Sequence, residues 1–526
     1  MNRISDHPQS RKRRFAVLSL FVAGLLFCGA ACGPDAAEET KDTMVSTAPL
    51  TLVTWTKWSE YKKGISFTAG KDLTIPSTAN ITFDGDKVDT FGKLTINGGF
   101  RCADGARTLK AKAILVSGAG ASFTCGGGLA DSTSSGYTQV PRKDGFTIEL
   151  FEQAAFSKDE MMAGCSAMDM DMSMVDSGYQ AFAVTCGATL DLNGFVPTVL
   201  WTRLSSTATP GGKTLTVKDM LDCSVWKNGE EVAIASSSFD DTQSEQRTIQ
   251  SCASSAAGSV IDVSSELEHS HFGGPQVTYT AGTKTLPLVN QAEVALLSRR
   301  IRFKGTETDK KAAHMLFMSA PGNIRIGGVE FSTVGRMGEL GRYPAHFHRV
   351  KDHIGRDAWI KNSSIHGSFS RCVTLHETNN VQIVNNICYD HYGHGFFLEE
   401  GNETGNVFER NLGFRTKETD EGRQLLETDR TSLNPHNSAG ASTFWISNPD
   451  NVYKNNVAAG SAGSGFWFGL KDAAHIPDMM TVPPVNTAMR QFEGNLAHSC
   501  SQGVTVDQGP NGDCPTTANP RNPCSG

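Results

Sequence analysis

The sequence predicts an all-β chain, a right-handed parallel β-helix preceded by smaller β-rich domains. A four-residue pattern recurs from Tyr343 to Asp507, and its copies are 28, 23, 48, 22 and 38 residues apart. The shorter steps match one coil of a solenoid, and the longer ones indicate coils with insertions. An asparagine also recurs just before an apolar residue or Cys, which suits a turn that tolerates the left-handed conformation. These asparagines are Asn362, Asn385, Asn411, Asn455 and Asn495.

The copies of the pattern predict which side chains point into the coils. Successive side chains of a strand point to opposite faces, so the first and third members, nearly all apolar, should fill the interior. They are Val373, Leu375, Phe396, Leu398, Phe444, Ile446, Phe466, Phe468, Val504 and Val506.

The second and fourth members should then form outward columns, with strands about 4.8 Å apart. One column is His346, Thr374, Phe397, Trp445, Trp467 and Thr505. Beside it runs the column His348, His376, Glu399, Ser447, Gly469 and Asp507. A third, three residues earlier, is Tyr343, Arg371, His394, Ser442, Ser464 and Gln502. We expect an exposed strip with titratable groups at one end and aromatic rings at the other, as a sugar-binding groove requires.

Composition limits the function classes. A chain of 526 residues exceeds one compact core, so two or three domains are expected. The 53 glycines and 8% aromatic residues favour β structure with many turns. A net charge of −7 argues against nucleic acid as a partner. After the N-terminus there is no apolar run long enough to cross a membrane.

The N-terminus predicts export, in a form typical of bacteria. Basic residues 11–14 precede the apolar run 15–28 in a signal peptide spanning 1–32. Residues 29–32, Gly-Ala-Ala-Cys, are similar to a lipoprotein cleavage site with Cys32 lipidated, and ordinary signal-peptidase cleavage is the alternative. A flexible linker over 33–49 would follow. The chain would then be a cell-surface or outer-membrane lipoprotein, otherwise secreted, with the lipid as its one membrane contact.

Thirteen cysteines in an exported chain predict disulfides. Three pairs are near in sequence: Cys102/Cys125, Cys165/Cys186 and Cys223/Cys252. Cys500, Cys514 and Cys524 leave one over. The sequence has no CxxC, which argues against a thiolate zinc site or a redox motif.

Spacing of strands and turns divides the rest of the chain. We expect a β domain over 50–155, a Met-rich insertion over 156–185, a second β domain over 186–305, the β-helix over 306–510 and a Pro/Gly/Cys tail over 511–526. The methionines allow a Cu(I) site, since thioethers suit that ion, but a solvated insertion is the favoured interpretation.

Several ordered motifs carry a resemblance to a known family. Trp58, Asp72–Pro76 and Gly92–Ile96 are similar to the eight-glycine domain. The motifs that follow are Arg342–His348, Phe369–His376, Phe397–Glu400, Leu425–Arg430 and Ser442–Trp445. Together they resemble the cell-migration-inducing, cell-surface hyaluronidase family, which is also related to fibrocystin-like proteins. The resemblance implies extracellular binding and depolymerisation of hyaluronan or another acidic glycan, with calcium as a cofactor.

The residues of the strip fit such chemistry. Glu399 or Glu400 could act as general acid, with His376 and His348 positioning or sharing a proton. Arg371 could pair with a uronate carboxylate, and His394 lies at the same charged end. Five residues are expected to bind substrate: Phe397, Trp445, Trp467, Arg342 and His346.

Three alternatives stay open at this point. The histidines could be packed coil residues covered by the segment 417–441, on which Asp429 and Arg430 would fold over the strip or form a local ion pair. His348, His376 and Glu399 could instead bind a divalent metal. The whole chain could be a non-catalytic glycan-binding or adhesion module.

Overall fold

The computed structural model describes residues 54–126, 141–166, 173–275, 277–352, 356–430, 440–470 and 482–507. The predicted signal peptide, Cys32, the linker and the C-terminal tail lie outside these residues. Almost all regular structure is β, as predicted. Among the described residues no helix has the length and apolar character to cross a membrane.

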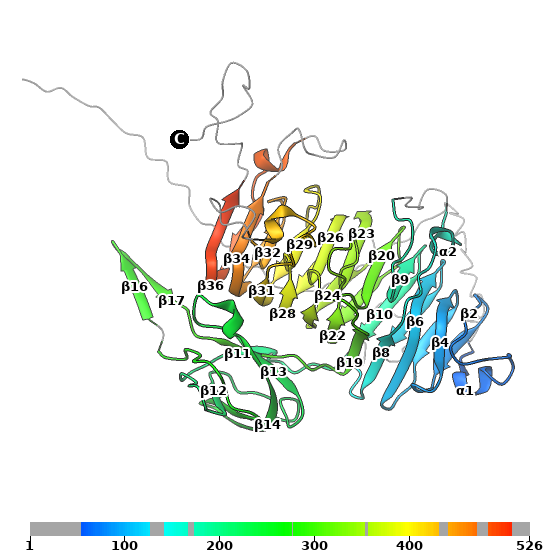
Figure 1. The fold of residues 1–526 in the computed structure, drawn as a ribbon, viewed down its shortest axis with the longest axis horizontal. Coiled ribbons are helices and arrows are strands. Elements are labelled where there is room, and N and C mark those ends of the chain that lie inside the picture. The colour runs from blue at the N-terminus through cyan, green and yellow to red at the C-terminus, as the bar shows by residue number, and fades with distance from the viewer. Residues whose placement is uncertain are drawn as a thin grey trace, which may run out of the picture. The chain divides into compact units, whose positions relative to one another are not determined.

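The main body is a parallel β-helix with three faces, here called A, B and C (Figure 1). Face A holds β1 (Thr56–Lys57), β3 (Asn80–Phe83), β5 (Gly99–Cys102), β7 (Ser122–Cys125), β10 (Thr189–Asn193), β21 (Ile324–Gly327), β24 (Ala358–Lys361), β27 (Gln382–Val384), β30 (Val407–Glu409), β33 (Val452–Lys454) and β35 (Gln491–Glu493). Each strand pairs in parallel with the next in this order, so successive coils stack.

Faces B and C share their longest strands. Face B holds β8 (Phe146–Leu150), β19 (Ile301–Gly305), β22 (Val329–Val334), β25 (Ser364–Ser368), β28 (Ile387–Tyr392) and β31 (Leu412–Lys417). Face C holds β2 (Leu73–Ile75), β9 (Ala181–Thr185), β20 (His314–Met318), β23 (Ala345–Asp352), β26 (Val373–Asn379), β29 (Phe396–Leu398) and β32 (Phe444–Ile446). Four strands cross both faces: β4 (Thr90–Ile96), β6 (Arg107–Ser117), β34 (Val457–Gly469) and β36 (Leu496–Asp507).

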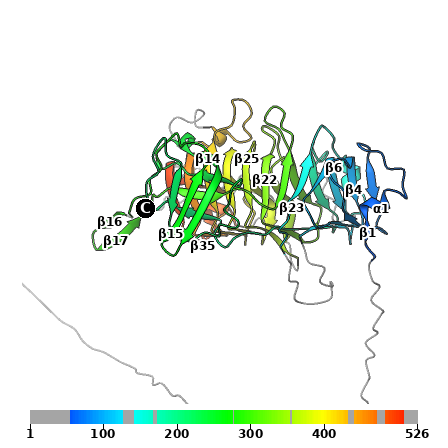
Figure 2. The same cartoon turned by 90° about the horizontal axis from the view of Figure 1, so that it is seen from below.

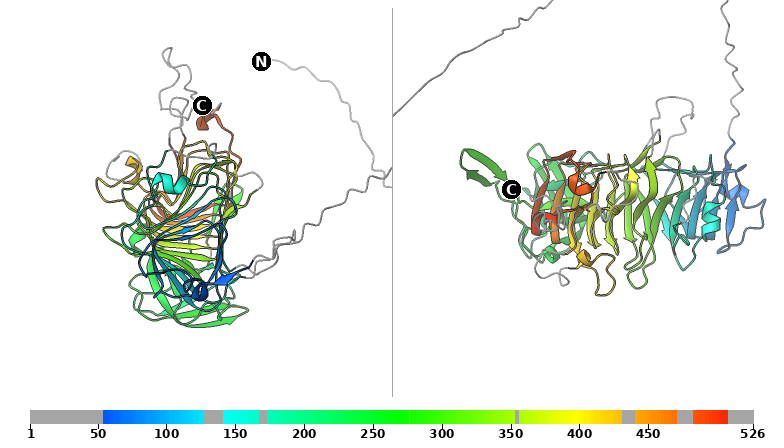
Figure 3. Two further views of the ribbon diagram at one scale, coloured as in Figure 1. Left: turned by 90° about the vertical axis from the view of Figure 1, so that its right-hand side faces the viewer. Right: turned by 90° about the horizontal axis from the view of Figure 1, so that it is seen from above.

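The side chains inside the coils form one continuous apolar core. Figure 3, left, shows the ribbon of the coils viewed along their axis. The predicted inward residues from Val373 to Phe468 all belong to it, so the register inferred from the repeat is confirmed. Val504 and Val506 differ, being 54% and 66% exposed. They lie in β36, and no strand among the described residues follows to close that coil around them.

A separate antiparallel domain is inserted between β10 and β19. Its strands are β11 (Trp201–Arg203), β12 (Thr214–Val217), β13 (Glu231–Ile234), β14 (Glu245–Ser255), β15 (Gly258–Val263) and β18 (Glu293–Leu296), with a hairpin of β16 (Val277–Ala281) and β17 (Lys284–Leu288). It has its own core around Trp226 and packs on face B (Figure 2). The contact joins Ala233 and Leu297 to face-B residues such as Tyr389 and Phe414.

The structure divides the chain differently from the expected boundaries. Strands before residue 306 belong to the same solenoid as those after it, since β10 pairs with β21 and β8 pairs with β19. The region expected as a first β domain therefore forms the early coils. Partners such as Leu190 and Ile324 are too far apart in sequence for local spacing to reveal their pairing.

The recurring asparagines occupy two different positions of the coil, one in a turn and one in a buried hydrogen-bonded ladder. Asn362, Asn385 and Asn455 have positive φ, as predicted for the turn between faces A and B. Asn411 and Asn495 instead belong to the next position, where buried asparagines form a ladder. Each side-chain Oδ1 there accepts the backbone N–H of the preceding coil, at 2.9–3.0 Å along Ser363, Asn386, Asn411, Asn456 and Asn495.

The three predicted disulfides, Cys102–Cys125, Cys165–Cys186 and Cys223–Cys252, are present. A fourth, Cys372–Cys388, was not predicted. Cys500 is buried and is the free cysteine of the described chain.

Two short helices border this body. Helix α1 (Trp58–Tyr61) buries Trp58 at the first coil. Helix α2 (Lys158–Met162) begins at Ser157, whose side chain and Glu160 form a reciprocal cap. Met161 and Met162 pack against the outer side of face C with Leu316 and Met318, so the expectation of a solvated insertion is wrong for these residues.

Candidate functional site: a histidine and carboxylate cluster on face C

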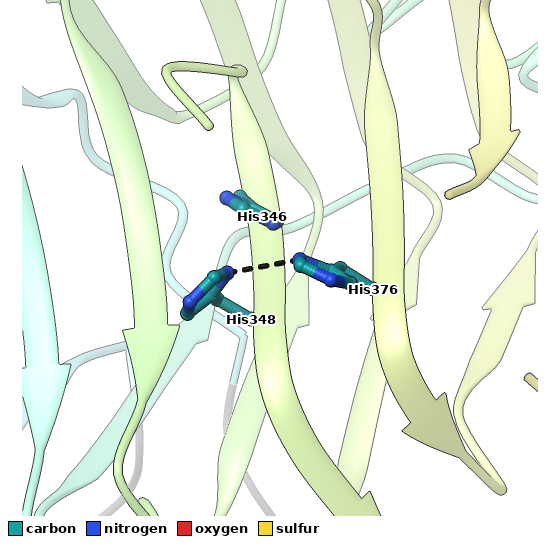
Figure 4. Close-up of side chains that lie close together, drawn as sticks. All are labelled: His346, His348 and His376. Carbon is teal, nitrogen blue, oxygen red and sulfur yellow. Dashed lines mark hydrogen bonds between the residues drawn. The ribbon is translucent and has the colours of Figure 1, made fainter. Parts of the chain in front are cut away.

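Three imidazoles meet on the outer side of face C (Figure 4). Strand β23 supplies His346 and His348, and β26 supplies His376 directly beside His348 in the ladder. One nitrogen of each ring lies within 4.8 Å of the others. The Nδ1 atoms of His348 and His376 are 3.1 Å apart. The period-two register therefore produces the cluster that the sequence predicted.

The other nitrogen of each ring has an outer partner. His346 Nδ1–H donates to the Gly341 carbonyl at 2.9 Å, which leaves Nε2 as the bare lone pair. His348 Nε2 is 2.9 Å from Ser173 Oγ. His376 Nε2 is 3.5 Å from Glu400 Oε1 and 3.8 Å from Glu377 Oε1. Ser173 and Glu377 were not predicted, although Glu377 directly follows His376 in the repeat.

Carboxylates border the cluster on one side. Glu399 directly follows β29, and its Oε2 is 3.8 Å from His346 Nε2. Both of these atoms are buried and have no hydrogen-bond partner. Glu403, also missed by sequence reasoning, is fully buried and accepts the backbone N–H groups of Glu377, Glu400 and Gly401. It fixes the turn that carries Glu399 and Glu400.

The environment shifts the protonation of these groups. Burial, helped by the neighbouring His348 and His376, holds the pKa of His346 well below its usual value. Burial also lowers the pKa of His376, but the Glu400 hydrogen bond and the nearby carboxylates outweigh it and the net shift is upward. Burial raises the pKa of Glu399, partly opposed by the charge of His376. His346 is therefore a neutral ring.

Arg371 is placed differently from its predicted role. It is 1% exposed, its guanidinium forms a two-bond ion pair with Asp429, and it lies over the Phe397 ring at 4.3 Å. Asp429 belongs to η2 (Glu427–Asp429), within the segment that crosses face C. Because its guanidinium is bonded to Asp429, Arg371 does not form a two-bond pair with a uronate carboxylate. The expectation that Asp429 folds over the strip is confirmed.

His394 is a structural histidine in this arrangement. The Ser442 backbone N–H donates to Nδ1 at 2.9 Å, so the ring proton is on Nε2, which lies 2.9 Å from Thr428 Oγ1. Burial lowers its pKa to about 3. It is fully buried and separated from solvent, so it does not share the setting of His376.

The predicted exposed aromatic strip is wrong. Phe397 and Trp467 point outward but are 2% and 1% exposed, while Trp445 is half-buried. Their rings pack on one another and on His394. The segment 417–430 contributes to this covering through Thr428 and Asp429, and the period-two pattern gives no information about such a layer.

The other side of the cluster is covered by the end of the Met-rich insertion. Arg342, predicted to bind substrate, is buried and bonded to Asp176, with Nη2 3.0 Å from Oδ1. Its Nη1 donates to Met174 Sδ. Met162 Sδ accepts from Ser319 Oγ, so these two sulfurs have ordinary partners rather than a Cu(I) arrangement. Met168, Met170 and Met172 lie outside the described residues.

Between these two coverings the cluster reaches the surface. The side chains of His376 and Glu399 are 14% and 13% exposed, and that of Glu400 is 35% exposed. Glu377 is similarly half-buried and pairs with Arg349 at 3.1 Å. We call His376, Glu377, Glu399 and Glu400 the face-C window. It presents acid–base groups to solvent, with His346 and His348 beneath.

His346, His348 and His376 together offer three imidazole nitrogens as metal ligands. Calcium takes six to eight oxygen ligands, and three imidazole nitrogens do not fit it. Imidazoles suit zinc and other first-row transition metals. Two further groups of ligand-type residues occur in the described chain, but Cys372 and Cys388 are joined as a disulfide, and Glu330 is already bonded to the Arg299 N–H.

Comparisons with known proteins agree with this architecture. Residues 310–504 match the CEMIP beta-helix model. Residues 57–205 match the G8 domain model. The first of these ranges contains the whole face-C window, and the second contains the early coils of the solenoid.

The curated relatives include cell surface hyaluronidases and fibrocystin-L. The human cell surface hyaluronidase CEMIP2 is 30% identical over 328 residues, covering 57% of this chain and 23% of that protein. The zebrafish (Danio rerio) cell surface hyaluronidase is 29% identical over 387 residues, covering 66% and 27%. Mouse fibrocystin-L is 30% identical over 354 residues, covering 59% and 8%. The chain thus spans a third or less of the length of these relatives.

Proposed function

We propose that this chain binds an acidic polysaccharide and cleaves it at the face-C window, with hyaluronan as the first substrate to test. The observation that carries the proposal is the position of Glu399 and Glu400. They flank a partly exposed His376 on the surface left open between two covering segments. This surface lies in the stretch that matches the CEMIP beta-helix model, and two relatives of this chain are named cell surface hyaluronidase.

The chemistry needs one group to protonate the leaving glycosidic oxygen and a second to activate the attacking water or hold the sugar. Glu400 is the more exposed carboxyl and is hydrogen-bonded to His376, which orients it. Glu399 lies deeper, beside His346. We assign Glu400 to contact with the polymer and Glu399 to proton transfer, with His376 between them.

Substrate binding uses other groups than those predicted. Arg371, Phe397 and Trp467 are buried, so they support the site rather than touch the polymer. Trp445 keeps an exposed part and lies two strands beyond His376 on face C, about 10 Å along the stack. A polymer that follows the helix axis would pass from the window to Trp445.

The proposed location is the cell surface. The two hyaluronidase relatives carry that location in their names. The basic, apolar leader and Cys32 supply an export signal and an anchor in this chain. Calcium is supplied in the assays below because the family resemblance implies it, although the three imidazoles of the cluster do not suit that ion.

The decisive experiment follows polymer length. Hyaluronan and other uronate polymers are incubated with the folded chain, and their size is measured over time. We expect shortening by the parent and a ~10²–10⁴-fold loss in Glu399→Gln, since that is the usual contribution of general acid–base catalysis. Glu409→Gln, on face A, is the matched control and should keep full activity.

A binding module is the other outcome. Mouse fibrocystin-L is also a relative of this chain, and a shared fold alone does not require catalysis. Retention of hyaluronan by the folded parent without any shortening would replace the enzymatic proposal by this one. Loss of retention in Glu400→Gln would still place the contact at the window.

A further inference from the structure

We propose that His346, His348 and His376 form a first-row transition-metal site, with Zn²⁺ as the first candidate. The inference goes beyond the polysaccharide activity proposed above and does not depend on it. Three features of the cluster support it: the spacing of the nitrogens, the partners of the opposite ring nitrogens, and two buried atoms that lack partners.

The spacing suits coordination to one ion. Tetrahedral zinc with Zn–N bonds of 2.0–2.1 Å holds its ligand nitrogens roughly 3.3 Å apart. His348 Nδ1 and His376 Nδ1 are 3.1 Å apart, and one nitrogen of His346 lies within 4.8 Å of one nitrogen in each of the other two rings. Small movements of the rings would bring three nitrogens to the spacing of a coordination shell. Both β23 and β26 hold these residues in register, so the spacing is built into the ladder.

The outer partners have the pattern of a metal site. Histidine ligands usually donate their second N–H to a carbonyl, a carboxylate or another polar oxygen, which sets the tautomer and the ring orientation. Here His346 uses the Gly341 carbonyl, His348 lies beside the Ser173 hydroxyl, and His376 lies beside the Glu400 carboxylate. All three rings are thus oriented with one nitrogen toward the common centre.

Two buried atoms lack a partner at that centre. His346 is 1% exposed, its proton is held on Nδ1, and its Nε2 lone pair has no hydrogen bond. Glu399 Oε2 has none either and lies 3.8 Å from it. Leaving a buried polar atom unpaired costs about 1–3 kcal/mol. A cation held by the three imidazoles would satisfy His346 Nε2 and would attract Glu399 Oε2 without coordinating it.

Charge favours the same ion. Glu377, Glu399 and Glu400 lie around the rings. The arginines nearby are each paired with a carboxylate: Arg349 with Glu377, Arg342 with Asp176 and Arg371 with Asp429. A divalent cation would offset this negative charge. It would also give the window an attraction for the carboxylates of a uronate polymer that its own side chains do not supply.

The test measures metal, not activity. The full chain is freed of metal with a chelator, then titrated with Zn²⁺ by calorimetry and with Co²⁺ by visible absorption. We expect one ion per chain, a tetrahedral Co²⁺ spectrum, and a melting temperature that rises with Zn²⁺. Ca²⁺ should not displace Co²⁺.

Variants locate the ion. His376→Gln and His348→Gln should each weaken Zn²⁺ binding at least 100-fold. His269→Ala, in the inserted domain, is the control for adventitious imidazole binding and should leave the affinity unchanged. Circular dichroism checks that each variant is folded.

Two results would overturn the proposal. The first is a folded parent that binds neither Zn²⁺ nor Co²⁺ at micromolar concentration. The second is equal binding by the parent and His376→Gln, which would place any ion elsewhere. Neither result bears on polymer cleavage, so the two proposals fail separately.

Discussion

Arg371 and Asp429, 58 residues apart in sequence, form a buried two-bond ion pair that fixes the segment 417–430 across face C. Both side chains are about 1% exposed. The pair joins the strip of the β-helix to the layer that covers it, and it also places the guanidinium against Phe397. The first two predictions concern this pair.

Asp429→Asn should destabilise the fold strongly. It leaves the Arg371 guanidinium buried without its counter-charge, and breaking a buried pair in this way costs about 3–5 kcal/mol. The measurement is the free energy of unfolding in urea. Asp420→Asn is the control, because Asp420 pairs with Lys310 at the surface and its loss should cost no more than about 1 kcal/mol. Equal effects of the two substitutions would mean that the buried pair does not hold the segment.

The same pair predicts a dependence of stability on pH. Burial would raise the pKa of Asp429, but Arg371 and His394 outweigh this and lower it to about 2, below the ordinary 3.8. A lowered folded-state pKa contributes stability above the unfolded value, and that contribution is lost as the pH falls from about 4 to 2. It amounts to about 2 kcal/mol. The gap between parent and Asp429→Asn should therefore narrow on acidification, and an unchanged gap at pH 2.5 would contradict the assignment.

The register of β29 predicts the cost of two neighbouring truncations. Leu398 lies in the interior and Phe397 lies under the covering layer, so Leu398→Ala should cost about 2–5 kcal/mol and Phe397→Ala about 3–5 kcal/mol. Val504→Ala is the apolar control, being more than half exposed, and should lie within about 0.5 kcal/mol of the parent. Thermal or urea unfolding distinguishes these outcomes. A Phe397→Ala variant as stable as the parent would show that the strip is open after all.

The asparagine ladder predicts that an Asn→Ala substitution lowers the free energy of unfolding more in the buried middle of the ladder than at its end. Asn411→Ala removes the acceptor of the Asn386 N–H and the donor to the Ile383 carbonyl, both buried, at about 1–3 kcal/mol each. Asn495→Ala at the half-buried end of the ladder should cost less, because water can reach the exposed groups. Unfolding free energies of the two variants give the comparison, and a larger loss at Asn495 would rule out the ladder as the source.

The leader predicts how the protein is retained. If Cys32 is lipidated, Cys32→Ala should move the chain from the membrane fraction to the soluble fraction, while Cys28→Ala should not. Fractionation followed by detection of the chain is the measurement. A parent chain found wholly in the soluble fraction would exclude the anchor.

Much of face C follows from the sequence, because the information is local. Alternation with period two decides that Leu398 points inward and His376 outward, and repetition of the pattern decides that His348 and His376 become neighbours. The three predicted disulfides are also local, with partners 21 to 29 residues apart. Cys372–Cys388 was missed although its partners are only 16 residues apart.

The covering of face C does not follow from the sequence. Nothing in the local pattern says that Asp429 reaches Arg371 or that Asp176 reaches Arg342, since these contacts depend on the path of whole segments. Arg371 and Phe397 were therefore assigned to substrate instead of to packing. The continuity of the solenoid before residue 306 was hidden in the same way, by an inserted domain that separates paired strands.

The inserted domain is synthesised before the coils against which it packs. The domain is inserted after β10. Its residues Ala233 and Leu297 pack against Tyr389 and Phe414 of face B. These two residues are synthesised about a hundred or more residues later. The domain has its own core and can fold as it emerges, since domains form as units from the N-terminus during synthesis. The apolar surface that contains Ala233 and Leu297 then stays exposed to solvent until the later coils of face B have been synthesised and cover it. We therefore expect chaperones to bind this exposed apolar surface of the nascent chain.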